Sequence, residues 1–230
     1  MKSISSITIL LIAIVYNSYA QQQFEGKIIY EMCFPAAMDL NPQKKNVEPK
    51  EVVVVTMFLK GYKMRMETLT LLNNNISFFD AKSKTAITLV DVKGLKTAVL
   101  MDKEEMEVDA KHNSINEKHK IILLDETKKI AGYNCKKIEI ILDEKRMEKL
   151  IIYYTDKIKS DAVNKNPYWI QARYNNISGL VLEYKVVSKK EVIYSVTAKQ
   201  VNIESIADEN FTIPTDYKKA SQEKAYKVRE

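Results

Sequence analysis

The sequence predicts a mainly β protein built on a single curved antiparallel sheet, with one or two short helices. Three observations support this fold class. Apolar segments of alternating or β-branched character recur about ten times along the chain. Most of them are separated by turns of a few residues, which favours antiparallel neighbours in a meander. Several carry one apolar and one charged face, as expected for a sheet with one buried and one solvated side.

The chain begins with a segment typical of a secretory signal peptide. Lys2 precedes an apolar run over residues 7–15, and small residues at Ser18 and Ala20 fit a cleavage site. The run is too short to cross a bilayer, and no later apolar stretch is long enough for a transmembrane helix. We expect an exported protein, periplasmic or extracellular, cleaved near Ala20; the alternative is a buried N-terminal helix. The expected divisions are a signal peptide (1–20), a single β domain (21–217) and a polar C-terminal tail (218–230).

The first half of the chain contains a series of short strands. A loop rich in Pro and Asn at residues 35–50 follows the first strand, and residues 51–60 are apolar on both faces, which predicts a central strand. Turns are expected at Lys60–Gly61 and around residues 81–83. The expected strands are residues 24–34, 51–60, 62–69, 71–80, 84–91 and 95–101.

The second half begins with a different segment. Residues 102–120 are charged and lack a period of two, so we expect an exposed connection, partly helical. A strand at 121–125 then precedes a hairpin over 136–156. The segment 159–176 contains the only Trp and predicts one short helix. A second hairpin over 179–206 completes the expected strands.

The stretch at residues 61–69 raises the question of what the inner side of the sheet faces. Tyr62, Met64 and Met66 alternate with Lys63, Arg65 and Glu67, so the two sets point to opposite sides. The few predicted helices offer little to cover the apolar side. Either the sheet closes on itself or a ligand helps to fill it.

The composition excludes several function classes. The formal charge is +6, but positive and negative residues alternate along the chain without a basic block, so we expect no nucleic-acid partner. The five glycines are scattered, and no phosphate-binding loop is present. His112 and His119 match no zinc spacing, and no carboxylate pair stands out. We expect no metal, no cofactor and no catalytic residues.

Two cysteines remain, Cys33 and Cys135. An even number in an oxidising compartment permits one disulfide, which would close a loop of about 100 residues and stabilise the fold by roughly 4–5 kcal/mol. Two free buried thiols are the alternative.

Several short segments, in this order, resemble a family of exported Bacteroidota proteins of unknown function. They are residues 24–32, 130–140 with Gly-Tyr-x-Cys, 154–156, 179–186 and 211–218. Members of that family are thought to share the half-barrel of bacterial lipoprotein carriers, the LolA/LolB-like fold. The resemblance implies a concave face that holds acyl chains, and it implies no catalytic residues.

A methionine lining would suit such a cavity, because methionine packs around ligands of varied shape. The candidate ligand-binding residues are Ile28, Tyr30, Met32, Tyr62, Met64 and Met66; the alternative is that all six belong to an ordinary core. The sequence thus favours a non-catalytic binding protein for a lipid, a lipidated protein or another hydrophobic ligand. The first alternative is an envelope interaction or structural protein with a self-filled core and a protein partner. The second is an enzyme with an unrecognised site.

Overall fold

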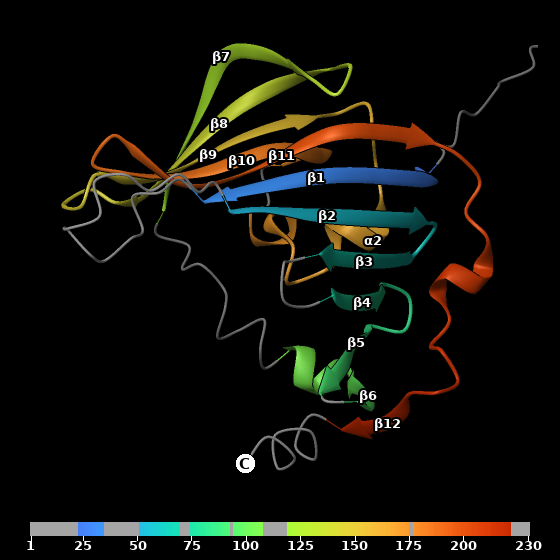
Figure 1. Ribbon diagram of the computed structural model, residues 1–230. Coiled ribbons are helices and arrows are strands. Elements are labelled where there is room, and N and C mark those ends of the chain that lie inside the picture. The colour runs from blue at the N-terminus through green and yellow to red at the C-terminus, as the bar shows by residue number, and fades with distance from the viewer. Residues whose placement is uncertain are drawn as a thin grey trace, which may run out of the picture.

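The computed structural model describes residues 23–34, 51–69, 74–92, 94–107, 119–174 and 177–221. One twelve-stranded sheet organises the molecule, in the order β12-β6-β5-β4-β3-β2-β1-β11-β10-β9-β8-β7 (Figure 1). The sheet is strongly curved and does not close on itself. The predicted fold class, a mainly β half-barrel with short helices, is confirmed.

The N-terminal meander reproduces the strands expected from alternation. Its turns fall where predicted, and the β2–β3 turn places Gly61 at a φ of +56°, a conformation that favours glycine. The six strands are β1 (Gly26–Phe34), β2 (Glu51–Lys60), β3 (Lys63–Leu69), β4 (Asn74–Asp80), β5 (Thr85–Val92) and β6 (Leu95–Met101).

The C-terminal meander is joined to the first one by the pairing of β1 with β11. Strand β7 extends beyond the expected residues 121–125, because its charged second half continues to pair with β8 across an irregularity between Leu124 and Thr127. The five strands are β7 (Lys120–Ile130), β8 (Tyr133–Asp143), β9 (Glu148–Thr155), β10 (Leu180–Ser188) and β11 (Glu191–Ile203).

Two glycines permit close contacts where strands begin. A Cβ atom at Gly26 would clash with the backbone oxygen of Asn202, and one at Gly179 would clash with that of Thr155. Glycine is therefore needed at the start of β1 and of β10, so that each can lie directly against its neighbour.

We call the inner face the side of the sheet that carries Tyr30 and Met64. The β9–β10 connection, described over residues 156–174 and 177–179, crosses it and contributes the helix α2 (Asp161–Asn164) and the 3-10 turn η2 (Ile170–Arg173) (Figure 1). Ser160 caps α2 by accepting a hydrogen bond from the Val163 N–H. The connection thus provides the helical segment that the sequence predicts between residues 159 and 176.

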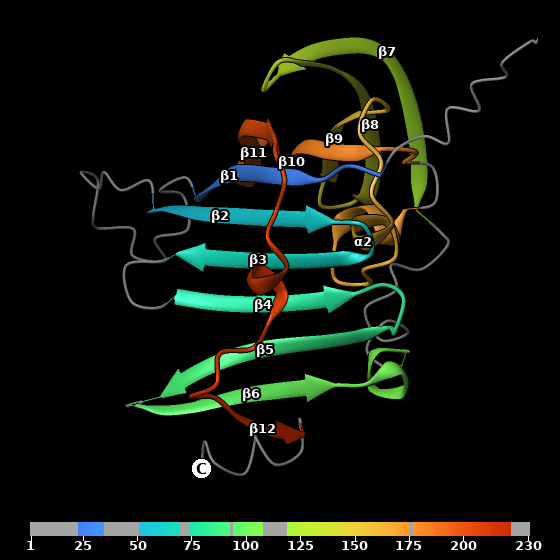
Figure 2. The same ribbon diagram turned by 90° about the vertical axis from the view of Figure 1, so that its right-hand side faces the viewer.

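The opposite side, the outer face, is crossed by a strap of residues 204–217 (Figure 2). The strap contains η3 (Asp208–Phe211), and its side chains Ile213 and Tyr217 pack on a cluster formed by Phe78, Leu89 and Ala98. It ends in β12 (Lys218–Ser221), which pairs with β6. The sheet therefore takes up residues 218–221 of the expected polar tail, and this pair is parallel rather than antiparallel.

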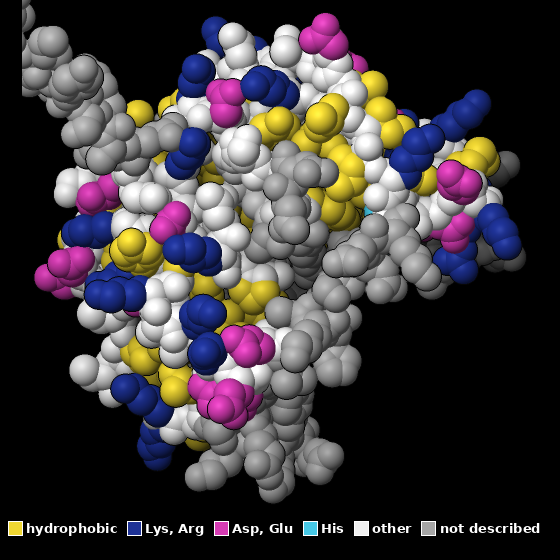
Figure 3. All heavy atoms as spheres, turned by 180° about the vertical axis from the view of Figure 1, so that it is seen from behind, with side chains coloured by type: hydrophobic (Ala, Val, Ile, Leu, Met, Phe, Trp, Pro, Cys, Tyr) yellow, Lys and Arg dark blue, Asp and Glu magenta, His cyan; other side chains and the backbone are white. Residues whose placement is uncertain are grey.

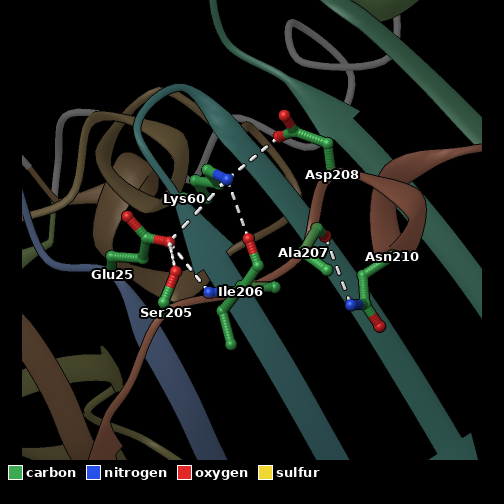
Figure 4. Close-up of polar contacts among 7 residues, drawn as sticks. All are labelled: Glu25, Lys60, Ser205, Ile206, Ala207, Asp208 and Asn210. Carbon is green, nitrogen blue, oxygen red and sulfur yellow. Dashed lines mark hydrogen bonds and ion pairs between the residues drawn. The ribbon is translucent and has the colours of Figure 1, made fainter.

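Lys60 anchors the strap at the end of β2 (Figure 4). Its ammonium group donates to the Ile206 carbonyl oxygen at 2.8 Å and pairs with the Asp208 carboxylate at 3.1 Å. Glu25 lies 3.9 Å from the same ammonium group and accepts a hydrogen bond from the Ile206 N–H at 2.8 Å. Both backbone groups of Ile206 are thereby satisfied by side chains of the sheet.

Some predictions lie outside the described residues: the signal peptide at 1–20, the loop at 35–50, and residues 108–118 of the charged connection. The described part of that connection is helical at residues 103–107. None of the described helices is long and apolar enough to span a membrane.

We predict that Lys60→Met lowers the free energy of unfolding by about 1–2 kcal/mol, because it removes one charged hydrogen bond and leaves the Ile206 carbonyl without its donor. Urea denaturation measures the loss, and hydrogen exchange should increase at residues 205–210. Lys27→Met is the matched control, since Lys27 makes only an ion pair with Glu204 at 3.7 Å among the described residues. Equal losses in the two variants would contradict an anchoring role for Lys60.

Candidate functional site

The central part of the inner face is sealed by the β9–β10 connection. Trp169 lies edge-on to Tyr30 with ring centroids 5.8 Å apart, and the Asn166 side-chain amide donates to the Met64 sulfur at 3.9 Å. The fully buried side chains beneath the connection include Ile28, Tyr30, Met57, Leu59 and Met64. This sealed region is an ordinary close-packed core.

Tyr30 shows how completely this region is closed to solvent. Its hydroxyl donates to the Val181 carbonyl oxygen at 3.0 Å, and only 1% of the residue is exposed. Burial raises the pKa of Tyr30 well above its ordinary value. A ligand could reach this position only if the connection moved away.

A second region of the inner face lies further along the strands, where β1 ends and β11 begins. We call it the aromatic end; it consists of Met32, Phe34, Tyr184 and Tyr194, all half-buried. The Phe34 and Tyr194 rings are 6.0 Å apart, and Tyr194 meets Tyr184 edge-on at 6.1 Å. Figure 3, which views the molecule from behind, shows hydrophobic side chains gathered on the upper part of this face.

The six candidate residues from the sequence thus divide into four groups. Ile28, Tyr30 and Met64 are core, whereas Met32 belongs to the aromatic end. Met66 is half-buried beside the sealed region, in register with Met57. Tyr62 is 47% exposed with the Lys165 ammonium over its ring at 5.4 Å, because it belongs to the β2–β3 turn rather than to the alternating strand.

Three aromatic residues were missing from the candidate set. Phe34 ends the first expected strand, and Tyr184 lies within the hairpin expected over residues 179–206. Their contact through Tyr194 depends on the order β1-β11-β10, which local alternation does not specify.

Cys33 and Cys135 are free thiols in this structure. Cys33 is half-buried on β1, whereas Cys135 is fully buried on β8, where it lies opposite Lys128. Their strands are also separated in the sheet by β11, β10 and β9. The disulfide alternative is therefore incompatible with the observed geometry, because a disulfide needs Cα atoms less than about 7 Å apart.

A cluster of charged residues lies on β7–β10. The Lys128 ammonium group lies 2.6 Å from the buried Glu183 carboxylate. Lys137 binds Glu126 at 2.8 Å, and the Tyr153 hydroxyl donates to the same carboxylate at 2.7 Å. Each of these carboxylates has a cationic partner, so removing Lys128 would leave the buried charge of Glu183 uncompensated.

Two pKa shifts follow from these contacts. The hydrogen bond from Lys137 holds the pKa of Glu126 below its ordinary value. Burial, followed by the hydrogen bond to Glu126, raises the pKa of Tyr153 to about 12. Both shifts favour the hydrogen-bonded pair of a neutral phenol and a carboxylate. Among the described residues, no group of three His, Cys, Asp or Glu side chains is arranged to hold a metal ion.

Comparison with known proteins gives no family for the chain. No family model and no curated protein matches it. Among solved structures, it resembles two crystal forms of PNGF-II at 15% and 14% identity, with TM-scores of 0.47 and 0.48; each match covers 89% of this chain and 33% or 32% of PNGF-II. MucB matches at 9% identity and a TM-score of 0.42, over 86% of this chain and 60% of MucB. The chain thus spans about a third of PNGF-II, and similarity at this level carries no argument about ligand or activity.

We predict that stability falls as the pH rises from about 10 to about 12, because the unfolded state loses the Tyr153 proton before the folded state does. The contribution of Tyr153 is complete below pH 10 and is lost above pH 12. Tyr153→Phe lacks this contribution, so the difference in unfolding free energy between the two proteins should shrink across that interval. Urea denaturation at pH 8, 10, 11 and 12 measures it, and a constant difference would contradict the assignment.

We also predict opposite outcomes for two methionines that the sequence pattern treats alike. Met64→Lys places a charge in the sealed region and should lower stability by about 4 kcal/mol or more, whereas Met64→Leu should cost less than about 1.5 kcal/mol. Met66→Lys should fold with a loss of about 1–2 kcal/mol, because a half-buried lysine can extend its ammonium group to water. Circular dichroism and thermal melting distinguish these outcomes; a stable Met64→Lys variant would show that the region is open.

Proposed function

We propose that this protein is an exported, non-catalytic binding protein that holds a lipid or another hydrophobic ligand at the aromatic end of its concave sheet. The observation that carries the proposal is that the apolar inner face continues beyond the region covered by the β9–β10 connection. There, Met32, Phe34, Tyr184 and Tyr194 remain half-buried and form one contiguous group. Half-buried apolar side chains in a concave surface are typical of ligand sites.

The residue types support a ligand of apolar and variable shape. None of the four side chains carries a charge at neutral pH, and three of them present aromatic rings. Methionine adapts to different packing partners, and tyrosine combines an apolar ring with a polar hydroxyl that can lie at the water boundary. An acyl chain fits these properties. Export through the N-terminal signal peptide, to the periplasm or the cell exterior, is part of the same proposal.

One observation favours a different function, that of an envelope interaction or structural protein. The central part of the inner face is filled by the chain's own Trp169 and by residues from α2, so the fold needs no ligand to complete its core. In that case the aromatic end would contact a protein partner instead of a lipid.

Native mass spectrometry of the chain from Gln21, purified without detergent from its own envelope fraction, tests the proposal. We expect a discrete added mass that extracts into organic solvent. Met32→Lys should fold and lose this mass, because the new charge lies in the binding surface. Met147→Lys is the matched control, since Met147 is 58% exposed in the β8–β9 turn. A wild-type protein that carries no extractable mass would favour the interaction protein, and cross-linking would then identify its partner.

A further inference from the structure

A separate pocket lies at the other end of the inner face, where the β4–β5 turn meets the segment that follows β6. Its volume is about 410 Å³, within the range of small-molecule sites. The base is apolar and nearly solvent-free, because Phe79, Ala81 and Met106 are 4–5% exposed. The residues that line it are Phe79, Ala81, Lys84, Lys103, Met106, Glu107, Lys165 and Pro167.

The rim of this pocket is predominantly cationic. Lys84, Lys103 and Lys165 line it together with one carboxylate, Glu107. Glu107 lies 3.9 Å from both Lys84 and Lys103, a long and exposed pairing that binds neither ammonium group firmly. Lys165 pairs with Asp161 at 3.0 Å outside the pocket lining. Because Asp161 neutralises Lys165, two positive charges, Lys84 and Lys103, face the single Glu107 carboxylate, and this excess attracts an anion.

From this combination we propose that the pocket binds an amphipathic anion: an alkyl chain with a carboxylate or phosphate monoester head group. The alkyl chain lies on Phe79, Ala81 and Met106, and the head group lies between Lys84 and Lys103. Lysine suits either head group, because its ammonium group acts as a point charge rather than as a fork of fixed geometry. The anion displaces Glu107 from its weak ion pairs, and no bond is made or broken.

This site is distinct from the aromatic end and does not depend on the function proposed for it. Phe79 pairs with Met64, which pairs with Leu59, whereas Met32 pairs with Val53 six residues earlier on β2. Six residues of strand correspond to about 20 Å. The sealed region lies between the two sites, so each can be tested while the other is unaffected.

Methyl-labelled methionine provides a probe for each site: Met106 for the pocket and Met32 for the aromatic end. Octanoate, octyl phosphate, octanol and acetate are titrated into the chain from Gln21, and the two methyl resonances are assigned with Met106→Leu and Met32→Leu. We expect octanoate or octyl phosphate, or both, to shift the Met106 signal saturably, and the more tightly bound of the two identifies the head group. Octanol should bind at least about tenfold more weakly, acetate should have no effect, and affinity should fall with added salt.

Three variants separate the pocket from non-specific attraction. Lys84→Gln combined with Lys103→Gln should weaken binding of the anion about tenfold, and it should leave octanol binding unchanged. Lys82→Gln removes one positive charge from the turn that carries Lys84, but outside the pocket lining, and should have no effect. Ala81→Leu fills the pocket base and should abolish the Met106 shift, with the other methionine signals confirming that it folds.

The proposal is overturned if Met106 does not respond to either anion, or if Lys82→Gln weakens binding as much as the double variant does. A shift at Met32 alone would support the lipid site at the aromatic end and reject this pocket. Conversely, a shift at Met106 with none at Met32 would support the pocket and count against an alkyl ligand at the aromatic end.

Discussion

The pairing of β1 with β11 is the constraint on which the rest of the structure depends. It is the contact that joins the two meanders into one sheet, and it runs from Gly26 opposite Ile203 to Cys33 opposite Ser195. Its register places Tyr30 opposite Ala198 and Met32 opposite Val196, so that the apolar face of one meander continues into the other. A slip by one residue would turn one of these faces outward and destroy both the core and the aromatic end.

The β9–β10 connection determines which part of the inner face is buried and which part stays accessible to a ligand. The apolar alternation is the same beneath Trp169 as it is at Met32, but among the described residues the central part is buried by the connection, whereas Met32 stays half-buried. The covered part separates two surfaces that differ in their chemistry. One end is aromatic and uncharged, whereas the other has an apolar base with a lysine rim.

Alternation and turn residues predicted the strands and their antiparallel order within each meander, because both are local properties of the chain. They did not predict the β1–β11 pairing, since its partners are distant in sequence and many strands offer an apolar face of similar pattern. For the same reason, the sequence predicted the same environment for Met64 and Met66. Their burial differs, because it depends on where α2 and its flanking residues pack. Tyr62 was assigned to the wrong environment because a turn interrupts the period of two. The strap was missed because its apolar residues, Ile213 and Tyr217, are few and lack periodicity.

The strap packs on one wing of the sheet, strands β3–β6, so that this wing and the opposite wing, β7–β9, are stabilised differently. In the β3–β6 wing, Met64 and Phe79 are buried on the inner face, and Phe78 and Leu89 are buried beneath the strap on the outer face. Packing on both sides holds β4 and β5, and the Ala81 N–H donates to the Tyr62 carbonyl oxygen at 2.9 Å, which ties down the β4–β5 turn that contributes Lys84 to the pocket. The β7–β9 wing instead has a charged cluster on its outer face and ends at the edge strand β7. The pocket therefore lies on the wing that is packed from both sides: this packing holds its apolar base in place, whereas its lysines stand on the exposed rim.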